Sequence, residues 1–133
     1  MPELINLPTH KDSRGDLTVI EKCLPFDVQR IYYIYHSTIQ RGGHRHKATT
    51  QALICVSGSV DVYVNDGESE QTITLSSPSQ CLIVNPQDWH TMQNISTATV
   101  LLVLASHHYN QEDYVDEPYH WIWKPEAHQR FTL

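Results

Sequence analysis

Short runs of alternating hydrophobic and polar residues follow one another along most of the chain. Two clear runs, Val60-Asp61-Val62-Tyr63-Val64 and Thr72-Ile73-Thr74-Leu75, flank the turn signal Asn65-Asp66-Gly67. Alternation with a period of two is typical of β-strands with one buried face, and Asp-Gly between two such runs indicates a hairpin. No segment before residue 110 shows helical periodicity. We therefore predict strands over residues 17–21, 29–36, 51–56, 59–64, 71–75, 80–84, 90–94 and 98–105.

Many short strands separated by turns predict an all-β closed barrel or two-sheet jelly roll, which leaves few open sheet edges. Residues 100–105 are apolar on both faces, so we expect one face to pack in the core and the other against a partner or the tail. This pattern favours a homodimer. We expect one domain over residues 1–115 and a C-terminal tail over 116–133, which is rich in large aromatic residues and packs on the barrel or on the partner.

Length and charge narrow the class of protein. A chain of 133 residues is the size of one domain, and its formal net charge of −6 argues against a nucleic-acid or membrane partner. No basic region followed by an apolar run is present near residue 1, and no segment approaches the ~20 apolar residues of a membrane span. We expect a soluble cytoplasmic protein. Cys23, Cys55 and Cys81 have no CxxC spacing and are expected to be reduced.

The residues that could take part in catalysis or ligand binding are concentrated in two segments. The first is Arg41-Gly42-Gly43-His44-Arg45-His46-Lys47, in which two histidines with a single residue between them are expected to point to the same side of a strand. The second runs from Pro86 to Asn94 and contains His90, so imidazoles from two hairpins are expected to meet inside one barrel. Arginines in or near the first segment predict a small anionic ligand, although Arg45 and Lys47 are better explained as solvated strand positions.

The spacing of His44, His46, Gln51 and Gly58 resembles the first cupin motif, and residues 86–94 resemble a shortened second motif. The resemblance implies a cupin (RmlC-like) jelly-roll barrel with a short C-terminal tail. Gln51 stands where many cupins have a metal-binding glutamate, and a neutral amide is a weaker ligand. We therefore expect no metal and no other cofactor, with zinc on three histidines as the alternative.

A closer resemblance, to the nucleotide-sugar 3,4-ketoisomerases, is carried by residues 12–17, 25–35, 41–47, 51–59, 89–90 and 101–106. It implies an isomerase that moves the keto group of dTDP-4-keto-6-deoxy-D-glucose from C4 to C3 through an enediol-like intermediate. The product would lead to a dTDP-3-amino-3,6-dideoxyhexose for surface glycans such as the O-antigen of lipopolysaccharide. Arg45 departs from the small residue that the family usually has between its histidines.

This chemistry removes a proton from C3 and delivers one to C4, and imidazole suits both steps because its pKa is near neutrality. The resemblance implies that His44 is the base at carbon and that His46 exchanges a proton with the sugar oxygens. Charge that develops on oxygen needs a preorganised donor, for which Tyr33 and Arg41 are the candidates. Alternation leaves open which face of the strand at 29–36 points inward. The resemblance implies that Tyr33 lies in the site. The expected substrate-binding residues are Arg30, Gly43, Gln51 and His90.

Other functions remain open at this point. A metal-dependent cupin dioxygenase would hold one ion on His44, His46, Gln51 and His90. A non-catalytic cupin would bind the sugar nucleotide without changing it. A 3,5-epimerase of the same barrel type would exchange a proton at C5. The sequence does not fix the configuration of the product at C4.

Overall fold

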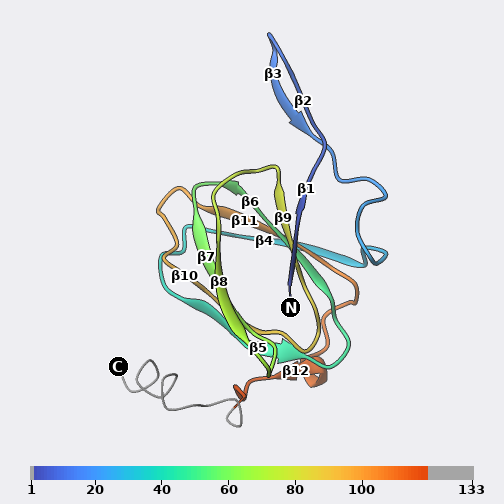
Figure 1. The fold of residues 1–133 in the computed structure, drawn as a ribbon, viewed down its shortest axis with the longest axis vertical. Helices are drawn as coiled ribbons and strands as arrows, with labels where there is room; N and C mark the ends of the chain where they lie inside the picture. Colours follow the sequence, from blue (N-terminus) through green and yellow to red (C-terminus); the bar gives the residue numbers. More distant parts are fainter. Residues whose placement is uncertain (1, 120–133) are drawn as a thin grey trace.

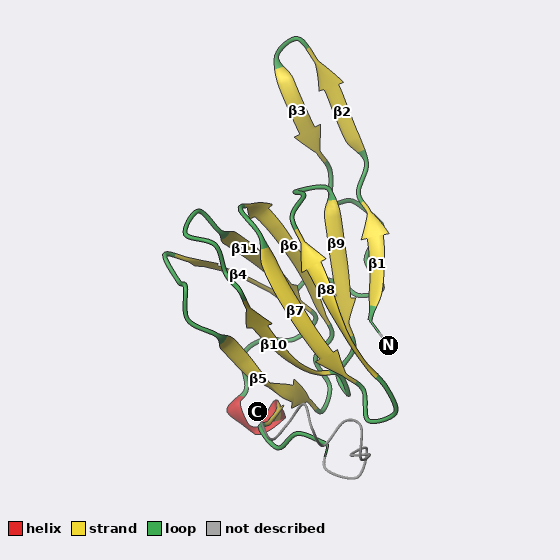
Figure 2. Ribbon diagram, turned by 60° about the vertical axis from the view of Figure 1, so that its left-hand side comes forward, coloured by secondary structure: helices red, strands yellow, loops and turns green. Residues whose placement is uncertain are grey.

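The computed structural model describes residues 2–119, which form two five-stranded antiparallel sheets that face each other, and a projecting hairpin (Figures 1 and 2). The elements are β1 (Glu3–Asn6), β2 (Thr9–Asp12), β3 (Gly15–Thr18), β4 (Arg30–Tyr35), β5 (Arg41–His46), β6 (Gln51–Ser57), β7 (Val60–Asn65), β8 (Glu70–Leu75), β9 (Gln80–Val84), β10 (Trp89–Gln93), β11 (Val100–Ala105), the 3-10 helix η1 (Gln111–Asp113) and β12 (Tyr114–Val115). The strand orders are β1-β9-β6-β11-β4 and β12-β5-β10-β7-β8, with β2 and β3 paired by themselves. This arrangement is a jelly roll.

Each predicted strand has an observed counterpart, and most boundaries agree within two residues. The prediction over 17–21 fits least well, because the observed strand β3 ends at Thr18. Strand β5, which carries the histidine pair expected to lie on a strand, has no counterpart among the predicted ranges, and neither do β1, β2 and β12. Strands β1, β2 and β12 are short, and most of their residues are exposed or only partly buried, so their sequences lack the alternation of a half-buried strand. Strand β5 contains no alternating hydrophobic residues, since its sequence is RGGHRH.

The main core lies between the two sheets. Its buried residues come from the inner faces of both sheets, for example Leu53 and Leu101 on one sheet and Val62 on the other. The outer face of β6, β9 and β11 carries a second apolar layer, in which Leu104 packs with Leu7 and Phe26 of the N-terminal segment. The two-faced apolar run at residues 100–105 is therefore covered partly by the chain's own N-terminal segment.

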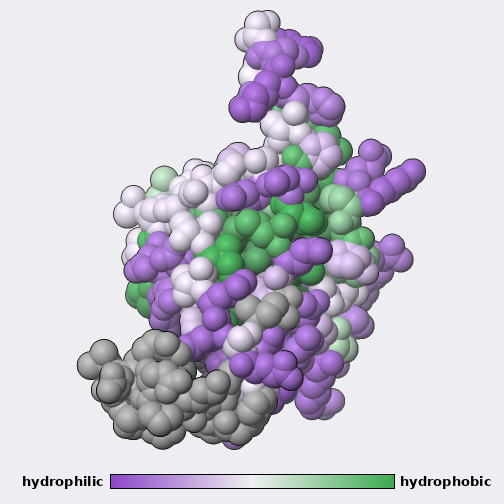
Figure 3. Space-filling view, viewed as in Figure 1, coloured by the Kyte–Doolittle hydropathy of each residue, from purple (hydrophilic) through white to green (hydrophobic). Residues whose placement is uncertain are grey.

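Part of the apolar surface stays exposed. Strand β4 turns Ile31, Tyr33 and Tyr35 outward with 55–62% of each side chain exposed, and the ring centroids of the two tyrosines lie 5.7 Å apart. On the face shown in Figure 3, a hydrophobic area lies below the base of the β2–β3 hairpin, bordered by hydrophilic residues. The hairpin itself extends away from both sheets (Figures 1 and 2), and its Leu17 is exposed. These surfaces are available for contact with another molecule.

Within residues 2–119 there is no helix that is long and apolar enough to cross a membrane. The three cysteines are free thiols, and Cys55 and Cys81 are buried in the barrel. Burial raises the pKa of the Cys81 thiol to about 12, which keeps it protonated and unreactive.

Candidate active site

Neighbouring strands β5 and β10 bring three histidines together. His44 and His90 are register partners in this pair, and their ring centroids lie 5.0 Å apart. The ring centroid of His46 lies 5.0 Å from that of His44 and 6.4 Å from that of His90. The close approach of the strands depends on Gly42, which has φ +86°, and a Cβ at this position would lie 2.9 Å from the carbonyl oxygen of His90. The predicted meeting of imidazoles from two hairpins is observed.

His46 is paired with Asp113 of η1. Its Nδ1 lies 2.8 Å from Asp113 Oδ2, and its side chain is 1% exposed. The other ring nitrogen, Nε2, is buried and has no hydrogen-bond partner among residues 2–119. Burial lowers the pKa of His46, and the hydrogen bond and charge of Asp113 oppose that effect.

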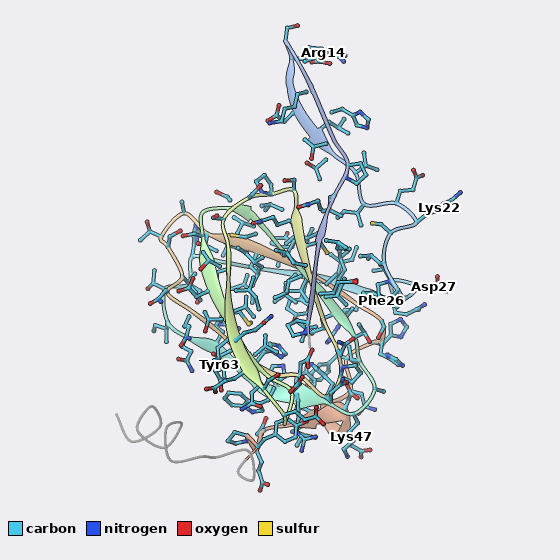
Figure 4. All side chains as sticks on the ribbon, in the orientation of Figure 1. Arg14, Lys22, Phe26, Asp27, Lys47 and Tyr63 are labelled. Atoms are coloured by element: carbon cyan, nitrogen blue, oxygen red, sulfur yellow. The ribbon has the colours of Figure 1, made fainter. Side chains whose placement is uncertain are left out.

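Asp113 is held as a carboxylate at the end of the barrel opposite the β2–β3 hairpin, beside Lys47 (Figure 4). Burial by itself would raise its pKa, but hydrogen bonds from the Thr49 hydroxyl, the Ala48 amide and His46 lower the pKa to about 2. Asp113 is therefore ionised at neutral pH and accepts the Nδ1 proton of His46.

The other two histidines are neutral at physiological pH. Burial, followed by repulsion from His46, lowers the pKa of His44 to about 4, and burial lowers that of His90 to about 4. The Nδ1 of His90 lies 3.0 Å from the Asp88 carbonyl oxygen, so this nitrogen carries the proton and donates it. The three imidazoles are therefore uncharged at neutral pH, and His44, which lines the cavity, can accept a proton from a bound molecule.

Tyr32 lies in the barrel, whereas Tyr33 does not. Arg30, Tyr32 and Ile34 face inward along β4, and Tyr33 faces outward with 62% of its side chain exposed. The prediction that Tyr33 lines the site is therefore wrong, because strand alternation gives the inner position to its neighbour. Burial, followed by the nearby Tyr114, raises the pKa of Tyr32, so its hydroxyl stays protonated.

Gln51 is buried at the inner face of β6, and its Nε2 donates to the Tyr32 hydroxyl oxygen over 3.1 Å. That bond leaves the Tyr32 proton available to another acceptor. Gln51 thus orients a phenol in this chain. Within residues 2–119, no three His, Cys, Asp or Glu side chains are placed to hold one metal ion.

A cavity of about 370 Å³ opens beside His44 and Tyr32. It is lined by Arg30, Ile31, Tyr32, Ile34, Arg41, Gly42, His44, Met92 and Tyr114. Tyr114 closes one side, with its ring centroid 4.7 Å from that of His44 and 4.6 Å from that of His46. Of the expected site residues, Arg30, Arg41 and His44 are in this lining. His46, Gln51 and His90 are buried behind it, and Gly43 lies beside Trp89.

The cavity carries positive charge from two arginines. The Arg30 guanidinium lies over the rings of Tyr32 and Tyr109, 5.2 and 5.6 Å from their centroids, and its Nη2 donates to the Tyr114 hydroxyl. Arg41 lies at the exposed start of β5. Neither guanidinium forms an ion pair with any of residues 2–119. Cations without a carboxylate partner at a cavity are suited to bind an anionic ligand.

Three site residues are not among the sequence-based candidates: Tyr32, Asp113 and Tyr114. Strand alternation contains the signal for Tyr32, since Arg30 and Tyr32 share a face. Asp113 lies 67 residues after His46, and no spacing rule connects the two positions.

Comparison with known proteins identifies the family. Residues 1–124 match the family model described as "FdtA: WxcM-like, C-terminal". The chain belongs to the FdtA family. The TDP-4-oxo-6-deoxy-α-D-glucose-3,4-oxoisomerase of Aneurinibacillus thermoaerophilus is 43% identical over 117 residues, which cover 85% of this chain and 84% of that protein.

Solved structures agree with this assignment to the FdtA family. The 3,4-ketoisomerase QdtA from Thermoanaerobacterium thermosaccharolyticum, solved as a variant with TDP-4-keto-6-deoxyglucose, is 38% identical with a TM-score of 0.85, covering 98% of this chain and 96% of that chain. The TDP-quinovose 3,4-ketoisomerase WlaRB from Campylobacter jejuni is 38% identical with a TM-score of 0.84, and the match covers 87% of this chain and 92% of that chain. These matches confirm the predicted cupin jelly roll and the predicted family.

Proposed function

We propose that this FdtA-family protein is a 3,4-ketoisomerase that converts dTDP-4-keto-6-deoxy-D-glucose into the 3-keto sugar. The observation that carries the proposal is a pair of neutral imidazoles beside the protonated Tyr32: His44 lines the cavity with Tyr32, and the buried His46 ring lies 5.0 Å from the His44 ring. The names of the relatives, which are 3,4-ketoisomerases of TDP-linked sugars, support the same reaction.

The reaction removes two protons from the sugar and adds two. His44 takes the proton from C3, the electron pair of that C–H bond forms the C3–C4 double bond of an enediol-like intermediate, and the π pair of the C4 carbonyl moves to O4. His46 moves the proton of the C3 hydroxyl to O4, and the electron pair released at O3 forms the C3 carbonyl. The electron pair of the C3–C4 double bond then takes a proton at C4 from His44, whose imidazolium proton exchanges with solvent before it is delivered. The sugar loses one proton from C3 and one from O3, gains one at C4 and one at O4, and keeps every electron pair, so the balance requires no redox cofactor and we propose that none is used.

Tyr32 and Arg41 stabilise the negative charge that develops on oxygen during these transfers. A phenol that already accepts a hydrogen bond from Gln51 has its proton directed away from that bond, and it needs little reorganisation as the charge develops. Arg41 lies at the cavity mouth, where it neutralises either the oxygen or the diphosphate.

The diphosphate is bound by Arg30 and Arg41. Arg30 is fixed between two aromatic rings, and its buried Nε has no partner among the described residues, so it offers an N–H group for a phosphate oxygen. His90 contributes as a buried wall of the site beside His44, and Gln51 contributes through Tyr32.

The active form is a homodimer in the cytoplasm. The exposed outer face of β4, the hydrophobic area in Figure 3 and Leu17 of the projecting hairpin provide apolar surface for a second copy of the chain. Free cysteines fit a reducing compartment. The 3-keto product suits an aminotransferase that makes a 3-amino-3,6-dideoxy sugar nucleotide for a surface glycan.

The proposal is tested by mixing the purified protein with dTDP-4-keto-6-deoxy-D-glucose and following the sugar by NMR. We expect the C4 carbonyl signal to be replaced by a C3 carbonyl signal, and we expect His44→Asn protein at equal concentration to convert the sugar at least about 10²-fold more slowly. Binding of the sugar nucleotide without conversion by the unmodified protein would reject the isomerase and favour a binding module.

A further inference from the structure

The carboxylate of Asp113 receives four hydrogen bonds, which fix its orientation. Its Oδ1 accepts the backbone N–H groups of Lys47 at 3.2 Å and Ala48 at 2.7 Å. Its Oδ2 accepts from the hydroxyl of Thr49 and lies 2.8 Å from the Nδ1 of His46. The backbone holds Asp113 as well, since the N–H group of Lys47 also donates to its carbonyl oxygen.

This arrangement determines which nitrogen of His46 carries the proton. A carboxylate can only accept, so Nδ1 is the protonated nitrogen of the neutral ring. The lone pair is then on Nε2, which is buried and has no acceptor or donor among residues 2–119. Tyr114 packs against the same ring and keeps it from turning.

We propose that Asp113 is the positioning residue of the isomerisation, because it sets the His46 tautomer that can accept a proton from the C3 hydroxyl of the substrate. This inference rests on the proposed function. It assigns a specific task to the segment after β11: η1 delivers the carboxylate from outside the barrel, while β5 delivers the imidazole from within it.

The substitution Asp113→Asn tests this assignment, because the two N–H groups of Lys47 and Ala48 dictate how the new amide is oriented. They require an acceptor, so the amide oxygen takes the place of Oδ1 and the amide nitrogen faces His46. That nitrogen donates to Nδ1, which moves the ring proton to Nε2. The geometry of the site is preserved while the tautomer is reversed.

The tautomer is read directly from ¹⁵N NMR of histidine-labelled protein without substrate. We expect His46 to be protonated at Nδ1 in the unmodified protein and at Nε2 in the Asp113→Asn variant. We also expect kcat to fall by roughly 10²- to 10⁴-fold, the range found for lost acid–base catalysis and for a wrong histidine tautomer. KM should change little, because Arg30 and Arg41 are untouched.

Glu112→Gln is the matched control. Glu112 is the neighbouring residue of η1, is exposed, and loses the same charge on substitution. We expect this variant to keep both the Nδ1 tautomer and the full kcat. A comparable loss in the control would assign the effect to the net charge of η1 and overturn the proposal.

Three other results would also overturn it: an Nε2-protonated His46 in the unmodified protein, an unchanged tautomer in Asp113→Asn, or a reversed tautomer with full kcat. The first measurement needs no variant, so the proposal can fail even if Asp113→Asn does not fold. It also needs no turnover, so a protein that shows the Nδ1 tautomer but no isomerase activity would refute the proposed function separately.

Discussion

Replacing Tyr32 by phenylalanine removes one hydroxyl group from the inner wall of the cavity and leaves the shape of the side chain almost unchanged. Two consequences follow from the contacts of that hydroxyl. The Nε2 of Gln51, on a side chain that is fully buried, loses its acceptor, which costs about 1–3 kcal/mol of folding stability. The transition state loses one preorganised donor, which costs about 3 kcal/mol, or roughly a 10²-fold decrease in kcat.

The neighbouring residue provides the matched control. Tyr33→Phe makes the same chemical change one position along β4, but its hydroxyl lies on the outer face of the strand. We expect this variant to keep the kcat and the urea-unfolding midpoint of the unmodified protein. The assay is steady-state turnover of dTDP-4-keto-6-deoxy-D-glucose, with urea unfolding measured on the same preparations. Full activity in Tyr32→Phe, or an equal loss in Tyr33→Phe, would refute the assignment of the oxygen-stabilising donor.

Three further predictions follow from the histidines. His44→Asn should lower kcat by at least about 10²-fold. The double variant with His46→Asn should have a kcat little below that of the less active single variant. A double variant whose kcat falls by the product of the two single decreases would contradict a shared site. Exhaustive EDTA treatment should leave the rate unchanged, whereas activity that is lost and then restored by Zn²⁺ or Fe²⁺ would contradict the proposed metal-free mechanism. The free energy of unfolding should fall as the pH drops from 6.5 towards 4, because the unfolded chain binds protons that the depressed pKa values of His44 and His90 exclude from the folded state. By pH 5 the loss is about 2 kcal/mol for the fully buried His90 and less for the half-buried His44, and equal urea midpoints at pH 7 and pH 5 would contradict it.

The barrel was predictable from the sequence because most of its strands have one buried face. Alternation in the 60–64 and 72–75 runs and the turn between them mark β7 and β8 without any other information. The histidine site was predictable for the same reason, since two residues on a strand that are separated by a single residue share a side, as His44 and His46 do. Strand β1 was not, because much of its surface is exposed at a sheet edge and its sequence does not alternate.

Tyr33 shows where resemblance and physical reasoning conflicted. Arg30 and Tyr33 are three positions apart on one strand and cannot face the same cavity, so placing both in the site contradicts strand alternation. Consistent use of alternation with Arg30 would have selected Tyr32. Asp113 is a different case, because its contact with His46 depends on how the chain returns after β11, and a single sequence carries no local pattern for that path.

Conversion of dTDP-4-keto-6-deoxy-D-glucose in deuterated water, followed by NMR, tests the central claim most directly. Proton transfer through His44 predicts one deuterium at C4 of a 3-keto product, with the C5 position unlabelled, and the coupling at C4 reports the configuration. Deuterium at C5 would identify an epimerase instead. A sugar that is bound but neither converted nor labelled would contradict catalysis by this site.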